Sequence, residues 1–449
     1  MTLDIKDCGD YFKIEIASDF DLLDCHAANP QRYPFLLESN DASHSANAFD
    51  ILFGFPGEKI ESSSIKNNQF FAKFDHAFER EKVASKADKL PFTGGWFVFL
   101  SYELIGVIEE KLSDLQVDKS LPVVSAVRIP LAIIRSHQDN RCWIVCEKGH
   151  DALIKQVLVD LESLEKSGFN YPTVKLKEDP SNDFLAGVKK IKSYLIEGDT
   201  LQVNLSRQWA GEFAGQSDYL DVYRSLRVHN PSPFAGLACF GETVICSSSP
   251  ERLISCVDDV VQMRPIAGTR PRDKDELLDN SFAQELLFNA KESAEHIMLI
   301  DLIRNDLGRI CTTGTVKVDE KMSLESYAEV HHIVSNVTGK LVSGMSPSNV
   351  IKAVFPGGTI TGCPKVRCME IINELEKTPR GAYTGSMGYI NRNGNLDLNI
   401  LIRTFTINDR QLILRTGAGI VADSIAEKEL EETRHKAKAL LQALNISNG

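Results

Sequence analysis

The chain has 449 residues and a formal net charge of −12, with 43% apolar and 25% charged residues. This composition is ordinary for a globular protein whose core is large enough to fold without disulfides or a structural metal. The acidic balance argues against a nucleic-acid or membrane-surface partner, so an anionic ligand would need a local cluster of positive groups. No run reaches the ~20 apolar residues of a membrane span, and the start does not resemble a signal peptide. We therefore expect a cytoplasmic protein with ten unpaired cysteines.

The N-terminal part mixes short strands with helices. "WFVFL" (96–100) has the length of a buried strand, and "AVRIPLAIIRS" and "RCWIVCE" also read as strands. A helical pattern follows at "DALIKQVLVDLESLEK". The next stretch, 167–183, combines glycine, two prolines, charges and turn formers. We place a boundary there, between an N-terminal β-rich segment, 1–170, and a second region, 183–449.

The C-terminal region repeats this mixture of strands and helices. Its patterns predict a helix at 183–197, strands near 201–209, 234–247, 251–266 and 397–416, and long helices near 282–307 and 425–444. "NRNGN" (391–395) is typical of a hairpin and favours antiparallel pairing. Glycine-rich βαβ fingerprints are missing from the sequence. The predicted fold class is therefore α+β, with mainly antiparallel sheets.

Two predicted helices carry paired carboxylates. Glu292 and Glu295 are three residues apart, so both project from one helix face. Glu429, Glu432 and Lys436 share a face of the last helix in the same way. Taken alone, such a pattern most often marks a solvated face. Four carboxylates from two helices could also converge on Mg²⁺, which prefers oxygen ligands and keeps positions for water and an anionic substrate.

Two glycine-rich loops and one arginine suggest anion binding. Gly417 and Gly419 in "RTGAGIVADS" would let backbone N–H groups approach an anion near a helix start, although a tight turn explains the same pattern. Arg403 ends the alternating run "LDLNILIRTF", where burial is costly unless it meets an anion. The loop "FPGGTITGCPKVR" is not a phosphate loop, because Lys365 does not follow a glycine.

Three further segments supply candidate acid–base groups. In "SSSPERLI", Glu251 follows a proline at a strand start and could be a general acid if its pKa is raised; a salt-bridged loop carboxylate is the simpler interpretation. "VHHIVS" places adjacent histidines on a strand, so they face opposite ways. "RPIAGTRPR" (264–272) concentrates three arginines around a small residue, Ala267.

Taken together, these segments resemble the chorismate-utilising enzymes. The resemblance is carried in chain order by "GDTLQVNLS", "SPERL", "RPIAGTRPR", "AEHIMLIDLIRNDLGRI", "VHHIVS", "FPGGTITGCPKVRCMEII", "GAYTGSMGYI", "LNILIRT", "GAGIVADS" and "EETRHKAKALL". It covers about residues 183–445, and more weakly "LLES", "FDI" and "GGWFVFLSYEL". It implies two facing β-sheets flanked by helices, with the N-terminal segment contributing to the sandwich and the chorismate-binding catalytic region in 183–449.

The resemblance also implies roles for individual residues. Mg²⁺ would hold the ring carboxylate of the chorismate dianion, and Glu251 would protonate the hydroxyl that leaves from C4. The positions that match the metal ligands are Glu292, Glu295, Glu429 and Glu432. The positions that match substrate contacts are Arg403 and Tyr383 for the enolpyruvyl carboxylate, Lys436 with the Gly417 and Gly419 backbone for the ring carboxylate, and Thr359 and His332 near the ring.

Gln202 bears on the nucleophile. Relatives that add water to chorismate carry a lysine base at this position, and a glutamine amide cannot deprotonate water at neutral pH. The nucleophile should therefore be ammonia, which needs no base. A glutamine amidotransferase subunit would supply it.

The product depends on two conflicting signals. "QVNLS", "FPGGTITG", "YTGSMGYI" and "LNILIRT" resemble the versions of these motifs found in aminodeoxychorismate synthases, so we predict 4-amino-4-deoxychorismate, a folate precursor. Many of those enzymes carry lysine where Ala267 stands, and alanine there is the anthranilate-synthase pattern. The alternatives are an anthranilate synthase component I, which also releases pyruvate, and an inactive chorismate-fold binding subunit. The resemblance further implies a tryptophan pocket near "LLES" and "NPSPF".

Overall fold

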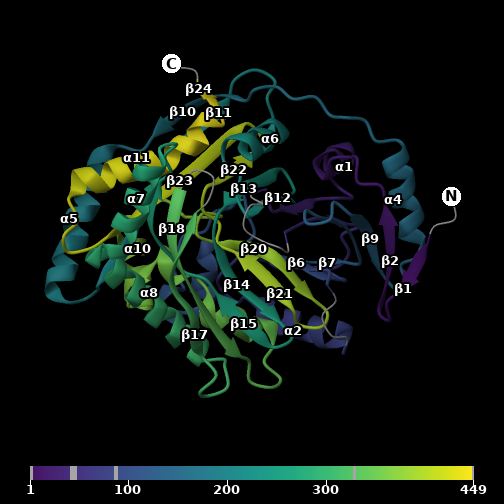
Figure 1. Cartoon of the computed structure of the whole chain (residues 1–449), viewed down its shortest axis with the longest axis horizontal. Coiled ribbons are helices and arrows are strands. Elements are labelled where there is room, and N and C mark those ends of the chain that lie inside the picture. The colour runs from purple at the N-terminus through teal and green to yellow at the C-terminus, as the bar shows by residue number, and fades with distance from the viewer. Residues whose placement is uncertain (1–3, 41–47, 85–88, 327–329, 447–449) are drawn as a thin grey trace.

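The computed structural model of the chain describes residues 4–40, 48–84, 89–326 and 330–446. Two large, mainly antiparallel sheets face each other, and helices cover their outer sides (Figure 1). Side chains from both sheets meet between them, as in the stacked rings of Phe35 and Phe97, whose centroids are 4.0 Å apart. This arrangement confirms the predicted α+β class and the two facing sheets.

The first sheet has 14 described strands and draws on both ends of the chain. In spatial order its strands are β1 (Ile5–Asp7), β2 (Tyr11–Ile16), β9 (Cys142–Glu147), β8 (Leu131–Ser136), β4 (Phe49–Gly54), β3 (Phe35–Glu38), β12 (Phe234–Phe240), β13 (Thr243–Ser249), β22 (Thr404–Asn408), β23 (Gln411–Ile420), β11 (Gln202–Phe213), β10 (Thr173–Glu178) and β24 (Asn445–Ile446), with β19 (Gly362–Cys363) paired to β11.

The second sheet has 10 described strands. Their order is β16 (Ile266–Pro271), β18 (Val330–Lys340), β15 (Val260–Met263), β14 (Arg252–Val257), β21 (Leu396–Asn399), β20 (Ser386–Asn391), β6 (Gly95–Leu100), β7 (Val124–Ile129) and β5 (Lys59–Ser62), with β17 (Lys317–Ser326) paired to β18. The N-terminal segment therefore contributes strands to both sheets.

Amphipathic helices pack around the two sheets. They are α1 (Leu22–Ala28), α2 (Phe70–Glu81), α3 (Ile105–Ile108), α4 (Ala152–Glu162), α5 (Ser181–Glu197), α6 (Tyr219–His229), α7 (Glu276–Phe288), α8 (Ala290–Gly308), α9 (Pro347–Val354), α10 (Lys365–Leu375) and α11 (Ala426–Gln442), with short 3₁₀ turns η1 (Tyr102–Leu104), η2 (Glu110–Leu112) and η3 (Gly358–Ile360). α5 and α11 pack against each other and on β23 (Figure 1). No helix in the described ranges is long and apolar enough to cross a membrane.

Most predicted elements are present, but several are divided: the helix predicted at 282–307 is two helices, α7 and α8, and the strands predicted at 234–247 and 251–266 are each split at a turn. The hairpin at "NRNGN" is confirmed, since β20 and β21 pair antiparallel across it. The stretch 167–183, predicted as a boundary between two regions, contains β10, which pairs with β11. The run predicted as one strand through Arg403 is broken, because β21 ends at Asn399 and β22 begins at Thr404.

That break has a structural cause: the chain changes sheets there. β21 belongs to the second sheet and β22 to the first, so residues 400–403 cross between them. The chain makes the reverse crossing between β13 and β14, at Pro250 and Glu251. The two crossings are bonded to each other, since Ile400 N donates to Glu251 O and Ser248 N donates to Arg403 O, both at 3.0 Å. Because of these bonds, Glu251 on one crossing and Arg403 on the other lie next to each other.

Candidate active site

Glu251 lies buried at the first crossing. Its side chain accepts a hydrogen bond from Thr359 Oγ1 at 2.8 Å, and the residue is 7% exposed. Burial raises the pKa of Glu251 to about 7, while the Thr359 hydrogen bond and the charges of Lys436 and Arg403 oppose the rise. The Glu251 carboxyl can therefore hold a proton near neutral pH, as a general acid requires. It is not a salt-bridged loop carboxylate, because no ion pair to a described residue is present.

Arg403 lies beside it at the second crossing, with φ of 52°. That left-handed backbone is uncommon for a side chain as large as arginine and aims it out of the strand direction. Burial lowers the pKa of Arg403, and the Glu251 charge counteracts this effect. Within the described residues no carboxylate pairs with the Arg403 guanidinium. A buried cation in that state favours binding of an anion.

The two adjacent histidines face opposite ways, as predicted. His331 bonds Asp279 and Ser326 at 3.0 and 2.7 Å, away from the site. His332 Nδ1 lies 3.1 Å from the carbonyl of Gly268. Burial lowers the pKa of His332, the contact with the Gly268 carbonyl opposes this, and the charge of Arg403 lowers the pKa further.

Gln202 joins the predicted metal ligands to the glycine-rich strand. Its Nε2 donates to Glu295 Oε1 at 2.7 Å. A Cβ on Gly419 would lie 2.3 Å from the same nitrogen, so the strand leaves room for the Gln202 side chain only because a glycine stands there. α8 and β23 therefore meet at Gln202.

Gly417, two residues before Gly419 on β23, occupies an equally tight position. A Cβ on Gly417 would lie 2.9 Å from the Tyr383 hydroxyl and 2.8 Å from the Leu205 carbonyl. The Gly417 carbonyl accepts from Lys436 Nζ at 3.0 Å, and Lys436 also pairs with Glu432 at 2.7 Å. Strand β23 and helix α11 thus bring Tyr383, Lys436 and Glu432 to one edge of the site.

The arginine-rich run 264–272 lies along another side of the candidate site. Gly268 has φ of 64°, and a Cβ there would lie 2.8 Å from Glu292 Oε2. Arg270 contacts Glu292 at 3.4 Å and Glu285 at 3.0 Å, and Arg272 pairs with Asp279. Both arginines therefore pair with carboxylates. The Ala267 backbone pairs with Ile333, while its side chain lies outside the described residues.

The four candidate metal ligands are not drawn together around a common point. Glu292, Glu295 and Glu432 engage Arg270, Gln202 and Lys436, respectively. Glu429 lies one turn before Glu432 on α11. In the described part of the chain, no three His, Cys, Asp or Glu side chains lie close enough to hold a metal ion. The donors fit a hard divalent cation by type, but they would have to change partners to bind it.

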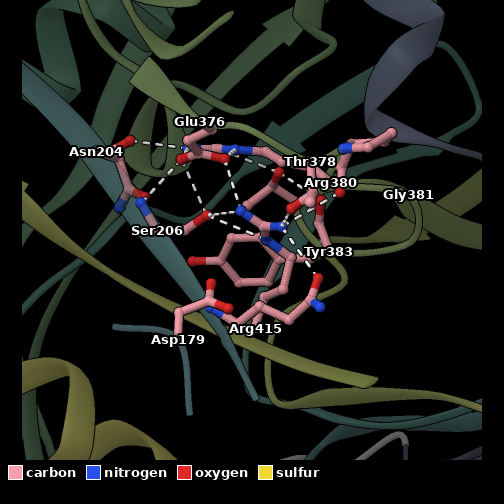
Figure 2. Close-up of polar contacts among 12 residues, drawn as sticks. Asp179, Asn204, Ser206, Glu376, Thr378, Arg380, Gly381, Tyr383 and Arg415 are labelled. Carbon is pink, nitrogen blue, oxygen red and sulfur yellow. Dashed lines mark hydrogen bonds and ion pairs between the residues drawn. The ribbon is translucent and has the colours of Figure 1, made fainter. Parts of the chain in front are cut away.

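Sequence reasoning missed a buried ionic network behind Tyr383. Glu376, Arg380 and Arg415 have almost fully buried side chains, and both arginines pair with Glu376 (Figure 2). The available signal was an arginine in the alternating strand "QLILRTG" and a second one in "TPRGAYTG". Neither pattern shows which distant residues would compensate the charge.

The segments predicted to flank a tryptophan pocket lie together. Asn40 N donates to Ser232 O at 3.0 Å, which joins the end of "LLES" to "NPSPF". The Glu38 carboxylate accepts from Tyr223 and Arg227 at 2.7 and 2.5 Å. Tryptophan binding at this place stays a prediction.

Comparisons with known proteins agree on one family. The family model described as "chorismate binding enzyme" matches residues 32–442. Anthranilate synthase component 1 of Neisseria meningitidis serogroup C is 48% identical over 450 residues, which cover 98% of this chain and 85% of that protein. Aminodeoxychorismate synthase component 1 of Bacillus subtilis is 40% identical over 369 residues, 79% of this chain and 78% of that protein. Several further relatives are also named anthranilate synthase component 1.

A solved structure shows the same architecture. The crystal structure of anthranilate synthase component I from Streptococcus pneumoniae superposes with a TM-score of 0.79 and 31% identity, covering 87% of this chain and 92% of that one. Its fold therefore accounts for nearly all of the two-sheet body. On the family match and the relatives together, this chain belongs to the chorismate-binding enzyme family.

Proposed function

We propose that the chain is the synthase subunit of a two-component enzyme that aminates chorismate, with anthranilate as the product. The observation that carries the proposal is the buried pair of crossings, where a protonatable Glu251 lies beside Thr359 and the uncompensated Arg403. A dianionic substrate with a hydroxyl leaving group requires both a cation and a proton donor. A proton donor and a buried cation side by side argue for an enzyme and against an inactive binding subunit.

The chemistry divides into two steps. Ammonia forms a bond to C2 of the ring as the C4 hydroxyl departs, and the Glu251 proton leaves with it as water. Loss of the C2 proton and the enolpyruvyl ether bond then gives the aromatic ring. The sum is chorismate plus ammonia to anthranilate, pyruvate and water. Glu251 acts in the first step, where hydroxide would be a poor leaving group.

The nucleophile follows from Gln202. This amide is held by Glu295 and cannot act as a base toward water, whereas neutral ammonia needs none. Relatives named component I or component 1 support a partner component that supplies it, and we propose a glutamine amidotransferase in that role.

Ala267 favours C2 as the final position of nitrogen. Without a lysine amine at this position, ammonia adds to C2 directly and no covalent enzyme intermediate forms. Transfer to C4 would then need a second nucleophile. The 48% identity to an anthranilate synthase component over 98% of the chain supports the same product.

The second candidate is 4-amino-4-deoxychorismate, the product predicted from the motifs. The 40% identity to the Bacillus subtilis aminodeoxychorismate synthase component favours it. The two products differ in a simple respect: aminodeoxychorismate keeps the enolpyruvyl group, and anthranilate formation releases it as pyruvate.

Incubation of the chain with chorismate, ammonium and Mg²⁺ separates these candidates. We expect anthranilate fluorescence and one equivalent of pyruvate per chorismate consumed, measured without an added lyase. Ala267→Lys should slow anthranilate formation, because its amine would occupy the position of ammonia. Consumption of chorismate without pyruvate would instead support aminodeoxychorismate, and no consumption with ammonium would contradict both.

Magnesium is proposed as the cofactor on the chemistry of its donors. Glu292, Glu295, Glu429 and Glu432 would supply carboxylate oxygens from α8 and α11. When bound, the ion would polarise the ring carboxylate and offset its charge. Lys436, which donates to the Gly417 carbonyl and pairs with Glu432, and the Gly417–Gly419 backbone would help to orient the same carboxylate.

A chelator should reduce turnover to background, and added Mg²⁺ should restore it. By isothermal titration calorimetry, Glu429→Gln should weaken Mg²⁺ binding by more than about tenfold. Glu431→Gln is the matched control, because Glu431 lies on the same helix but pairs with Arg434 on another face. Equal Mg²⁺ affinities in the two variants would contradict the proposed ligand set.

A further inference from the structure

Arg380 is the centre of the buried network behind Tyr383. Its Nε and Nη2 donate to Glu376 at 3.0 and 2.7 Å, and Nη2 also donates to the Asn204 carbonyl at 2.8 Å. Nη1 donates to the Ile360 carbonyl at 3.1 Å and contacts Thr384 Oγ1 at 3.3 Å. All five guanidinium N–H groups therefore have partners, although the side chain is 1% exposed.

Arg415 extends the network along strand β23. Its Nη2 donates to Glu376 Oε2 and to Ser206 Oγ, both at 3.0 Å. Its Nη1 donates to Thr378 Oγ1 at 2.7 Å. Ser206 in turn donates to Glu376 through both its backbone N and its hydroxyl, at 2.8 and 2.9 Å. Burial acts to raise the pKa of Glu376, but the two arginines together hold it below its usual value.

Each anchoring point lies on an element that presents a candidate site residue. Asn204 and Ser206 are on β11 with Gln202, and Ile360 follows Thr359 in η3. Arg415 is two residues before Gly417 on β23. Arg380 begins the turn in which Tyr383 N donates to Arg380 O at 3.0 Å, and Figure 2 shows the Tyr383 ring beside the network.

A structural role alone explains this arrangement poorly. Removing three charges from water is costly, and apolar packing of similar volume is often at least as stable. A bonded guanidinium fixes the distances between the elements that carry its acceptors, because its planar group holds several acceptors at once. A site that binds a dianion between four elements needs their relative positions fixed to a fraction of an ångström.

We propose that the Glu376–Arg380–Arg415 network is the positioning device of the substrate site, setting the spacing of β11, β23, η3 and the Tyr383 turn. The inference rests on the proposed chorismate site. None of the three side chains is taken to touch substrate. They act through Tyr383, Thr359 and the Gly417–Gly419 strand.

Arg415→Lys tests the proposal, because lysine keeps the charge and loses the fork. We expect KM for chorismate to rise about tenfold while kcat changes less than about threefold, since the contacts held in place bind ground and transition states alike. Ser206→Ala, a smaller change in the same network, should raise KM about threefold. The melting temperature of each variant is recorded in parallel.

Arg128→Lys is the matched control, since Arg128 is a largely buried arginine (12% side-chain exposure) bonded to Glu147 at 2.6 Å, on β7 of the other sheet. It should lower the melting temperature comparably and leave KM unchanged. If Arg415→Lys and Ser206→Ala lower stability without raising KM, the network is only structural and the proposal fails. Should Arg415→Lys not fold, Ser206→Ala decides alone. Wild-type protein that consumes no chorismate would refute the proposed function itself, which is a separate outcome.

Discussion

Glu251→Gln is expected to lower kcat for chorismate turnover by about 10³-fold, within the range that a positioned acid contributes. Glutamine has the same shape and can still accept the Thr359 hydrogen bond, now at 2.8 Å. It cannot release a proton to the departing hydroxyl. KM for chorismate should change little, because the Glu251 carboxyl is not proposed to bind either carboxylate. Product formation under saturating chorismate and ammonium measures the loss.

The pH profile gives an independent test of the same role. Burial raises the pKa of Glu251 to about 7, and only the protonated carboxyl can act as the acid. Wild-type kcat should therefore fall as the pH rises above about 7 and level off below it. Glu251→Gln should lose this alkaline limb along with the activity.

Glu103→Gln serves as the comparison. Glu103 is a second buried carboxyl whose pKa burial raises to about 7, but it accepts from the backbone of Arg380 and Gly381 away from the crossings. Its variant should keep the alkaline limb. If Glu251→Gln turned over chorismate within about threefold of wild type, another group would be the acid. A wild-type protein that binds chorismate without turnover would support the inactive-subunit alternative.

Helix periodicity predicted correctly which carboxylates share a helix face. The three-residue spacing of Glu292 and Glu295 predicted that both would project together, and the structure puts them against Gly268 and Gln202. Likewise, Glu432 and Lys436 pair one turn apart on α11. Such neighbours are fixed by local geometry, which sequence spacing encodes directly.

The two crossings could not be predicted in the same way. The alternation in "LDLNILIRTF" continues through residues 400–403, because both sheets bury one face there, and periodicity does not reveal a change of sheet. Arg403 was therefore placed in a strand. Its position beside Glu251 follows from pairing between segments about 150 residues apart, a long-range contact that no local pattern specifies.

The network around Glu376 illustrates the same limit. Ser206, Glu376 and Arg415 come from three elements, and each looks ordinary in its own segment. Only the assembled fold shows that their charges compensate one another. Motif resemblance predicted which residues would contact substrate, and it gave no prediction for the residues that hold them in place.

Removing the Arg403 charge should separate binding from stability. In Arg403→Met, KM for chorismate should rise about 100-fold, because a charge-assisted contact to the enolpyruvyl carboxylate is worth roughly 1.5–3 kcal/mol. Stability should increase by about 1 kcal/mol, because burial already lowers the pKa of this guanidinium and no described carboxylate pairs with it. Chorismate titration and urea unfolding measure the two effects.

Arg252→Met is the control for losing a nearby arginine. We expect it to lower stability and to leave KM unchanged, whereas Arg403→Met should raise both. Arg252 follows Glu251 directly, but its guanidinium bonds Asp397 at 2.8 and 2.9 Å. Removing it strands the Asp397 carboxylate, so the free energy of unfolding should fall while KM stays near the wild-type value. If Arg403→Met destabilised the protein as Arg252→Met does and left KM unchanged, Arg403 would be a structural cation. If the free energy of unfolding rises in Arg403→Met and falls in Arg252→Met, the protein lacks a carboxylate partner for Arg403 because the substrate supplies that negative charge.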